Sequence, residues 1–367
     1  MRFRRILPLI VIASVIAGAA ALAASDRETN DPLATEIERW TAFVRDHPSA
    51  DETWTQIKGA SEPVLARAQE ALRDGQRLLA LQRLAAARMY LAASVYVEKK
   101  PAARKDGAAF EAEWTRVGKV LGRDLEPARS TAFEGLRPAG VRALAEAAMP
   151  QVRVYYETSL EYGRNTMPQY GLLYLGVAQA QREFADFCRT LSFPSAGSPP
   201  PVRSIGPELD RLEDELLAAY RPPASIDKHS EFIAVSSGLK EARELDAAGL
   251  RYGALLKYLQ TEQRFALIHA GSPVPGSDAL AGRLHELESR LGKTGVDNSI
   301  GRIFLEAAQA DLAHPAAGGP ATAAAIAADV LPRYFDALSP GRPEPRRPEP
   351  RRPEPQVTVT LVRWPYP

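Results

Sequence analysis

Apolar residues recur at helical spacing along most of the chain. The first such series has steps of four, three and four, which place its members on one face of a helix: Leu33, Ile37, Trp40 and Val44. Asp31-Pro32 has the form of a helix start, an N-cap followed by a proline, and His47-Pro48 marks the end. We find no convincing strand alternation before residue 356. The pattern therefore predicts an all-α protein.

The same spacing predicts a series of further helices. One begins at Ser61-Glu62-Pro63, and one from 76 to 97 is apolar on most sides, which is typical of an inner helix. Lys99-Lys100-Pro101 closes that inner helix, since cations suit a helix C-terminus. The remaining predicted ranges are 107–121, 141–162, 167–191, 208–220, 228–245, 252–270, 277–291, 298–313 and 322–338.

The clearest periodicity lies between residues 167 and 191. Its apolar residues follow steps of four and three, which indicates a coiled-coil-like seam against a neighbouring helix: Leu173, Val177, Ala180, Phe184, Phe187 and Leu191. Cys188 is the single cysteine and lies beside this seam, so we expect a buried, inert thiol.

Helices joined by short connections predict stacked helical hairpins, as an α-solenoid or a multi-helix bundle. The Pro- and Gly-rich stretch 194–207 is the strongest internal linker signal. We therefore expect a domain or subdomain boundary there. The predicted organisation is a signal peptide (1–24), a helical part (25–193), the linker (194–207), a second helical part (208–338), a Pro-rich spacer (339–355) and a C-terminal peptide (356–367).

A weak internal similarity links Tyr170-Gly171-Leu172-Leu173 with Tyr252-Gly253-Ala254-Leu255, and Phe184-Ala185 with Phe265-Ala266. Around the second copy, one short stretch resembles half of a tetratricopeptide signature. The matching positions are Gly249, Tyr252, Phe265 and Pro273. Other signature positions hold Leu245, Ala248, Thr261 and Ile268, which depart from the pattern in two or three places. The resemblance covers about a tenth of the chain and implies stacked helical hairpins only.

The N-terminus has the order of a secretory signal. Met1-Arg2-Phe3-Arg4-Arg5 is cationic, residues 6–24 are apolar and then rich in alanine, and Ser25 begins a polar stretch. We therefore expect export to the periplasm or the medium. The alternative is an uncleaved inner-membrane anchor formed by residues 6–24, since about 19 apolar residues approach the roughly 20 that span a bilayer.

Charge and composition narrow the function. Forty-six basic and forty-five acidic side chains give a net charge of +1, which offers no basic field for nucleic acid. Aromatic residues make up 7% of the chain, which is low for a sugar-binding cleft. The single cysteine leaves an exported chain to rely on core packing.

The segment from Gly341 to Pro355 repeats Arg-Pro-Glu-Pro with proline at every second or third place. Such a sequence excludes helix and sheet and favours polyproline II. At about 3.1 Å per residue it can hold its far end roughly 45 Å away. The composition resembles the periplasm-crossing spacers of energy-transducing envelope proteins, whose folded end domain is absent here.

The last twelve residues contain the strongest strand signal, Val357-Thr358-Val359-Thr360-Leu361-Val362. A lone strand needs a sheet to join. We therefore expect this peptide to add to the edge of a partner's sheet. The predicted contact residues are Val357, Val359, Leu361, Trp364 and Tyr366. The alternative is that the peptide folds back on its own body or frays.

Fragments of catalytic motifs lack their context. Ser237-Gly238-Leu239-Lys240 and Lys293-Thr294-Gly295 match motifs of penicillin-interacting enzymes, but both occur in helical context, close together in the chain and with no S-x-N between them. Gly292-Lys293-Thr294 ends like a phosphate loop, whose leading glycine is replaced by Leu287. The histidines lack metal-ligand spacing: His47, His229, His269, His285 and His314. We predict no catalytic, cofactor-binding or metal-binding residue.

The sequence thus favours a non-catalytic exported scaffold that binds a protein partner in the cell envelope. One alternative is an exported helical toroid acting on carbohydrate, which would need a cleft lined by at least two of Trp40, Trp54 and Trp114 with a carboxylate pair. The other is a helical ligand-binding protein with a closed apolar cavity beside residues 173–191.

Overall fold

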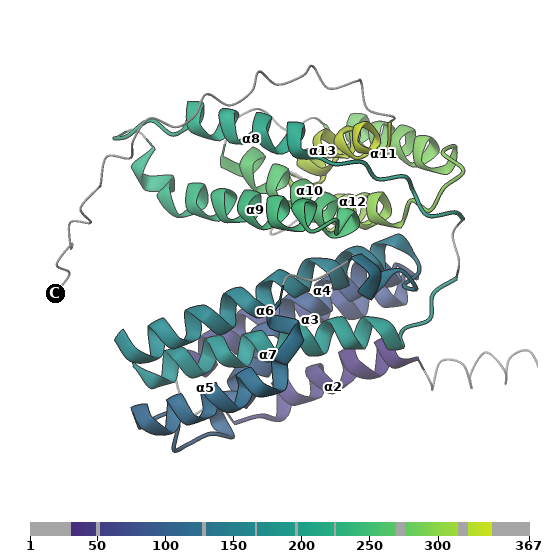
Figure 1. The fold of residues 1–367 in the computed structure, drawn as a ribbon. Coiled ribbons are helices and arrows are strands. Elements are labelled where there is room, and N and C mark those ends of the chain that lie inside the picture. Colours follow the sequence, from purple (N-terminus) through teal and green to yellow (C-terminus); the bar gives the residue numbers. More distant parts are fainter. Residues whose placement is uncertain are drawn as a thin grey trace, which may run out of the picture.

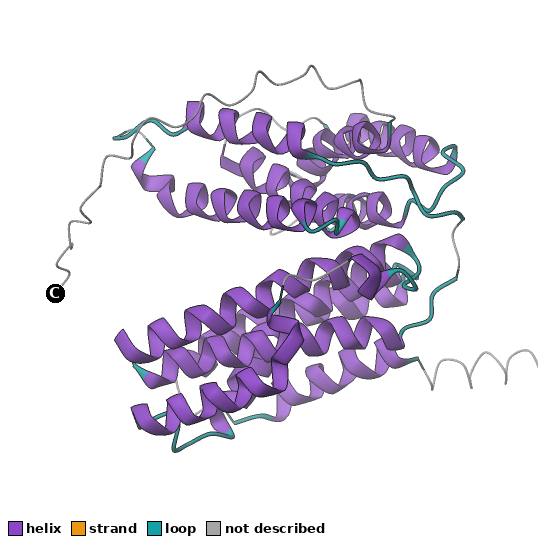
Figure 2. Cartoon of the chain, in the orientation of Figure 1, coloured by secondary structure: helices purple, strands orange, loops and turns teal. Residues whose placement is uncertain are grey.

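The computed structural model describes residues 31–48, 52–126, 130–165, 167–194, 197–223, 225–268, 276–314 and 322–339. Within these ranges the fold is an all-helical packed bundle (Figures 1 and 2). Three short 3₁₀ turns accompany the helices, η1 (Gly122–Leu125), η2 (Ser130–Phe133) and η3 (Ile226–Lys228). The α-helices are α2 (Pro32–Asp46), α3 (Glu52–Arg73), α4 (Arg77–Glu98), α5 (Gly107–Leu121), α6 (Ala139–Asn165), α7 (Pro168–Thr190), α8 (Gly206–Ala219), α9 (His229–Ala247), α10 (Arg251–Ile268), α11 (Ser277–Gly292), α12 (Ser299–Ala313) and α13 (Thr322–Leu338).

The helix predictions are confirmed at most positions, and α5 and α13 match the predicted bounds 107–121 and 322–338. The start predicted at Ser61 is wrong, because α3 begins at Glu52 and continues through Pro63. Proline removes one helical hydrogen bond. The apolar and small residues that α3 buries run through this point, so packing holds the helix together on both sides of it: Trp54, Ser61, Leu65, Ala68 and Ala71.

The helices form two layers, α2–α7 and α8–α13, which lie one above the other in Figure 1. The second layer repeats the packing of the first. In the first layer α3 packs on α2 and α4, and α7 packs on α4, α5 and α6. In the second layer α9 packs on α8 and α10, and α13 packs on α10, α11 and α12. The packing arrangement of helices α2 to α7 is therefore repeated, in the same chain order, by helices α8 to α13.

Corresponding helices share their buried patterns. The buried residues of α2 are spaced by four, three and four positions. The same spacing recurs along α8 and its N-cap residue: Ile205, Leu209, Leu212 and Leu216. The loop before α4 and the loop before α10 share the sequence Gly-x-Arg-x-x-Ala-Leu, which begins at Gly75 and at Gly249. Both glycines have positive φ, 77° and 74°, and the residue after each donates to the carbonyl five positions back. The two hairpins thus use one connection, a left-handed helix cap that glycine favours.

The sequence similarity between Tyr170-Gly171 and Tyr252-Gly253 does not follow this correspondence. It pairs α7 with α10, whereas packing pairs α7 with α13 and α10 with α4. Both glycines lie against α6: a Cβ at Gly171 would lie 2.6 Å from the Cα of Gly163, and one at Gly253 would lie 2.7 Å from the Cβ of Glu146. The similarity therefore reflects two close helix crossings on α6, which only a residue without a side chain permits.

The expectation of a single seam on α7 is incomplete. Val177, Ala180 and Phe184 are buried as predicted, but so is a second face that includes Leu172, Leu175 and Ala185. The reason is that α7 packs against both α6 and α4. Cys188 is buried, as predicted. The inner position of α4 is also confirmed, since it contacts α3, α7 and α12.

The segment between the layers, residues 197 to 205, contains no helix and is held at several points. Ser198 forms a parallel bridge with Val296, its carbonyl accepts from the amide of Asp297 at 2.7 Å, and the hydroxyl of Tyr252 donates to the carbonyl of Pro200 at 3.1 Å. One hydrophobic core runs through both layers. The division of the chain into subdomains at 194–207 stays a prediction.

The signal segment 1–24, the spacer 339–355 beyond Ser339 and the C-terminal peptide 356–367 lie outside the described residues. Among the helices that the structure does describe, none is both long and apolar enough to cross a membrane.

Candidate functional site

The two layers meet at a buried carboxylate on α6. The side chain of Glu146 is fully buried, and one of its oxygens accepts from the amide of Gly253 at 2.8 Å. Gly253 is the third residue of α10, so Glu146 satisfies one of the amides that a helix N-terminus leaves free. We call this contact between α6 and α10 the first joint.

Arg142 completes the first joint from one turn earlier on α6. Its Nε lies 2.7 Å from the second oxygen of Glu146, and its guanidinium covers the ring of Tyr252 at 4.6 Å. Burial raises the pKa of Glu146, although the amides of α10 and Arg142 favour its charged form. Because this buried carboxylate accepts hydrogen bonds from both α6 and α10, it fixes the angle between the two helices.

A second carboxylate on α12 does the same for α4. Glu306 accepts from the amide of Leu79, the third residue of α4, whose own N-cap residue Gln76 makes no side-chain capping bond. Burial raises the pKa of Glu306 to about 7, and its Oε2 is buried with no hydrogen-bond partner among the residues that the structure describes. We call this contact the second joint. Each layer therefore supplies one glutamate that caps a helix of the other layer.

The two joints share a sequence. Arg142 to Ala148 reads Arg-x-x-x-Glu-Ala-Ala, and so does Arg302 to Ala308. The helices that receive the caps share the Gly-x-Arg-x-x-Ala-Leu loop described above. Both halves of the joint are thus repeated in the chain, and this repetition is the signal by which the sequence could have revealed Glu146 and Glu306.

Between the two joints, α6 and α12 begin side by side. Asp297 accepts from the amide of Ala139 at 2.6 Å, and the hydroxyl of Ser299 accepts from the amide of Gly140 at 2.6 Å. A Cβ at Gly140 would lie 3.2 Å from the backbone of Ser299, so the two helix starts are in close contact. The N-terminus of α6 is therefore capped by the turn that precedes α12.

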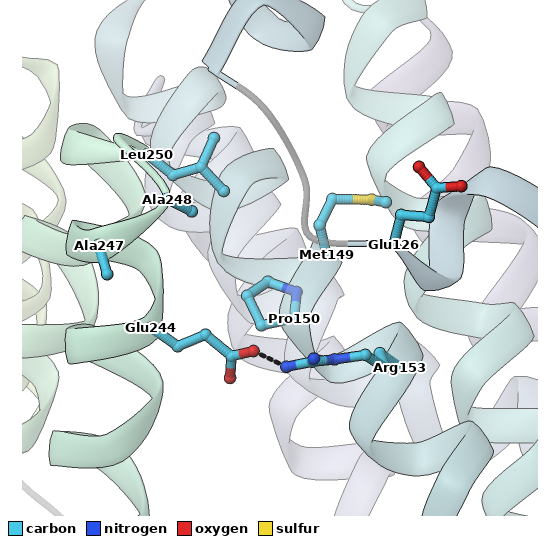
Figure 3. Close-up of a pocket in the computed structure, with 8 residues that line it drawn as sticks. All are labelled: Glu126, Met149, Pro150, Arg153, Glu244, Ala247, Ala248 and Leu250. Atoms are coloured by element: carbon cyan, nitrogen blue, oxygen red, sulfur yellow. Dashed lines mark ion pairs between the residues drawn. The ribbon is translucent and has the colours of Figure 1, made fainter.

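A pocket of about 280 Å³ opens beside the first joint (Figure 3). Figure 3 shows the side chains of Glu244 and Arg153 meeting across it, the first from α9 and the second from α6, as an ion pair between the layers. Glu126 lies at its border, and the rest of the wall is apolar or small: Met149, Pro150, Ala247, Ala248 and Leu250.

A pocket of about 300 Å³ occupies the equivalent place at the second joint. Gln309 and Ala310 stand three and four residues after Glu306, as Met149 and Pro150 do after Glu146. Asp74 and Gln76 flank Gly75, as Ala248 and Leu250 flank Gly249. Here too a side-chain contact joins the layers, since Nε2 of His314 lies 3.6 Å from a carboxylate oxygen of Glu70. The apolar wall of the first pocket is thus replaced by a polar one.

The three tryptophans that a carbohydrate-binding cleft would need pack against other aromatic side chains instead. Trp40 and Trp54 are each 4% exposed and both contact Phe43, at ring distances of 5.6 and 5.5 Å. Trp114 stacks on Tyr156 at 4.6 Å and donates to its carbonyl. They do not converge on one cleft. Beside residues 173–191 lies an open pocket of about 200 Å³ that includes Trp40, Tyr96 and charged groups, rather than a closed apolar cavity.

The first motif fragment lies within a helix, since Ser237 and Lys240 belong to α9. The second follows a helix: Lys293 is the C-cap of α11, and Thr294 and Gly295 lie in the connection to α12. Among the described residues no group of three or more His, Cys, Asp or Glu side chains could hold a metal ion. The predicted partner-binding residues Val357, Val359, Leu361, Trp364 and Tyr366 lie outside the described residues.

No family model, no curated protein and no solved structure matches this chain.

Proposed function

We propose that this protein is an exported, non-catalytic helical scaffold that binds a protein partner in the cell envelope. The proposal combines the signal-like residues 1–24, the strand-like peptide 356–367 and a body that offers a binding pocket between its layers. The tetratricopeptide-like relation of residues 245–273 and the stacked-hairpin description belong to the same proposal.

The observation that supports this function best is the pocket at the first joint. The charges of Arg153 and Glu244 at its rim pair with each other. Its wall, which includes Met149, Pro150 and Leu250, is apolar. A small apolar pocket with a paired rim suits an apolar side chain of a protein ligand.

The equivalent pocket at the second joint serves as an internal comparison. The corresponding positions hold Gln309 where the first pocket has Met149 and Gln76 where it has Leu250, so the repeated fold does not require apolar residues there. An apolar wall in one pocket alone therefore favours a binding role for the first.

The test is capture of partners by crosslinking in intact cells, followed by their identification. Trp364→Ala with Tyr366→Ala tests the tail, and Ala247→Asp, at an exposed residue of the pocket wall, tests the pocket. Leu217→Ala, at a side chain 67% exposed on α8, is the control. We expect the first two variants to lose a crosslinked protein that the control keeps. Capture of the same proteins by all variants would refute the proposal.

Export is tested separately on the same cells. N-terminal sequencing of the purified protein should give a start near Ser25, after removal of residues 1–24. Recovery of the chain from the cytoplasm with Met1 or Arg2 at its start would contradict export.

A further inference from the structure

Four tyrosines from three helices gather on the first layer. The rings of Tyr155 on α6 and Tyr174 on α7 stack with centroids 5.9 Å apart, and Tyr162 lies 4.7 Å from Tyr174. Tyr90 on α4 is a hydrogen-bond neighbour of Tyr155. We call these four residues the tyrosine platform.

The platform is open to solvent although it is aromatic. Tyr90 is 43% exposed and Tyr162 is 41% exposed. Burial raises the pKa of the Tyr155 and Tyr174 hydroxyls, so these groups keep their protons and act as hydrogen-bond donors at neutral pH. The surface thus combines exposed ring faces with hydroxyl donors.

The core packing of the repeated fold does not demand a tyrosine at position 90. Tyr90 is the fourteenth residue of α4, and the fourteenth residue of the corresponding helix α10 is Arg264. Fold stability therefore explains the exposed ring of Tyr90 poorly, and a ligand explains it better.

An acidic stripe runs beside the platform along α6. Val154 is 39% exposed, and Glu157 and Glu161 are exposed at the next positions of the same stripe. Tyr155 and Tyr162 form the neighbouring stripe of that helix. A ligand lying along α6 would therefore meet ring faces on one side and carboxylates on the other.

Polyproline II segments have the chemistry that fits this surface. They present flat proline rings and leave their backbone carbonyls free to accept hydrogen bonds, and aromatic grooves bind them at low entropic cost. The sequence of residues 343–355 favours this conformation, and its arginine pairs, which stand between Pro-Glu-Pro units, can pair with carboxylates.

We propose that the tyrosine platform binds the chain's own Arg-Pro-Glu-Pro spacer, residues 343–355, within one molecule. Proline rings pack on the tyrosine faces, tyrosine hydroxyls donate to the spacer carbonyls, and arginines of the spacer pair with Glu157 and Glu161. Residues 340 to 342 link Ser339 to the docked segment, and that segment itself spans about 40 Å at roughly 3.1 Å per residue. Tethering raises their local concentration to the order of millimolar.

Docking would hold the start of the C-terminal peptide at a fixed place on the helical body. The inference does not depend on the identity of a partner, since it concerns only contacts within this chain. It fails or stands independently of the crosslinking experiment, whose variants lie at Ala247, Trp364 and Tyr366.

The first test is trypsin cleavage of the purified full chain at the Arg346-Arg347 and Arg351-Arg352 bonds. A docked spacer is protected, so we expect Tyr90→Ala with Tyr162→Ala to accelerate cleavage roughly tenfold, for an affinity near 0.1 mM at a millimolar local concentration. Leu217→Ala with Ile226→Ala, two side chains more than half exposed, is the matched control and should cleave at the original rate. Equal cleavage rates in all proteins would overturn the proposal.

The second measurement reads the platform itself. Fluorine NMR of the 3-fluorotyrosine-labelled full chain should show shifted Tyr90 and Tyr162 signals when the six prolines from Pro343 to Pro355 are replaced by alanine. The signals of buried Tyr258 and Tyr334 should stay in place. The proposal would be overturned in favour of sugar binding if the Tyr90 and Tyr162 signals kept their chemical shifts when the prolines are replaced but shifted when a soluble glycan is added.

The intramolecular assignment is tested by concentration. Protection that is constant over a hundredfold dilution, in a protein that light scattering shows to be a monomer, supports it. Protection that disappears on dilution assigns the docked spacer to a second copy and overturns it.

Discussion

Arg88 in α4 and Glu262 in α10 occupy the same place in corresponding helices and carry opposite charges. Each is the twelfth residue of its helix, and they are 5% and 7% exposed. Arg88 lies 3.6 Å from Glu36 on α2 and 3.5 Å from Glu183 on α7. Glu262 lies 2.7 Å from Arg211 on α8 and 4.0 Å from Arg333 on α13. The partner helices correspond, so the two layers contain the same charge cluster with its polarity reversed.

Reversal of one charge in this cluster should destabilise the protein. Arg88→Glu places three carboxylates together beneath α2, and we expect a loss of about 3–5 kcal/mol in the free energy of unfolding. Arg88→Met keeps the packing of the aliphatic stem and adds no like charge, so it should cost less. Urea unfolding followed by circular dichroism measures both. A larger loss for the Met variant would contradict the charge-cluster interpretation.

The close crossing of α6 and α10 predicts a strong effect of one methyl group. Gly253→Ala places a Cβ 2.7 Å from that of Glu146 and should cost about 1–3 kcal/mol of unfolding free energy through overpacking. Gly282→Ala on α11 is the control, because a Cβ there meets nothing within 4 Å. It should stabilise by up to about 1 kcal/mol through helix propensity. Equal effects of the two substitutions would refute the crossing geometry.

Glu306 should make stability fall as pH rises towards neutrality. Its pKa in the fold is about 7, above the ordinary 4.5, so the folded protein holds this proton more tightly than the unfolded chain does. The stabilisation is therefore complete below pH 4.5 and is lost as the pH rises to about 7. Glu306→Gln removes this titration, and the melting temperature above pH 7 should rise relative to the original protein.

The control for the Glu306 experiment is Glu286→Gln, which neutralises an exposed carboxylate on α11. The difference in melting temperature between this control and Glu306→Gln, measured from pH 5 to 8, isolates the buried group. Parallel pH profiles for the two variants would show that Glu306 does not titrate in this range.

Cys188 should react only when the protein unfolds. Its side chain is inaccessible to solvent, and burial raises the pKa of the thiol to about 12, so almost no thiolate exists at neutral pH. A maleimide or a disulfide reagent should label the native protein at the rate of unfolding and the urea-unfolded chain within minutes. Rapid labelling of the native protein would contradict the burial.

The candidate site shows where sequence reasoning stopped. The Arg-x-x-x-Glu-Ala-Ala sequence is present at both Glu146 and Glu306, but on a single helix it has the form of an ordinary exposed ion pair. Only the structure shows that each glutamate meets the start of a helix more than 100 residues away, since Gly253 and Leu79 are distant in the chain. The tyrosine platform was equally hidden, because its four residues come from three helices.

The sequence by itself determined the helices and most of their ends, because helical periodicity, proline and capping residues act over a few positions. It determined the inner position of α4 and the burial of Cys188 for the same reason, since both follow from local apolar patterns. The tertiary structure decided that Pro63 stays inside α3, that α7 buries two faces and that two layers repeat one packing plan. These outcomes depend on contacts between distant segments, where the burial of Leu65 or the capping of Gly253 by Glu146 outweighs the local signals.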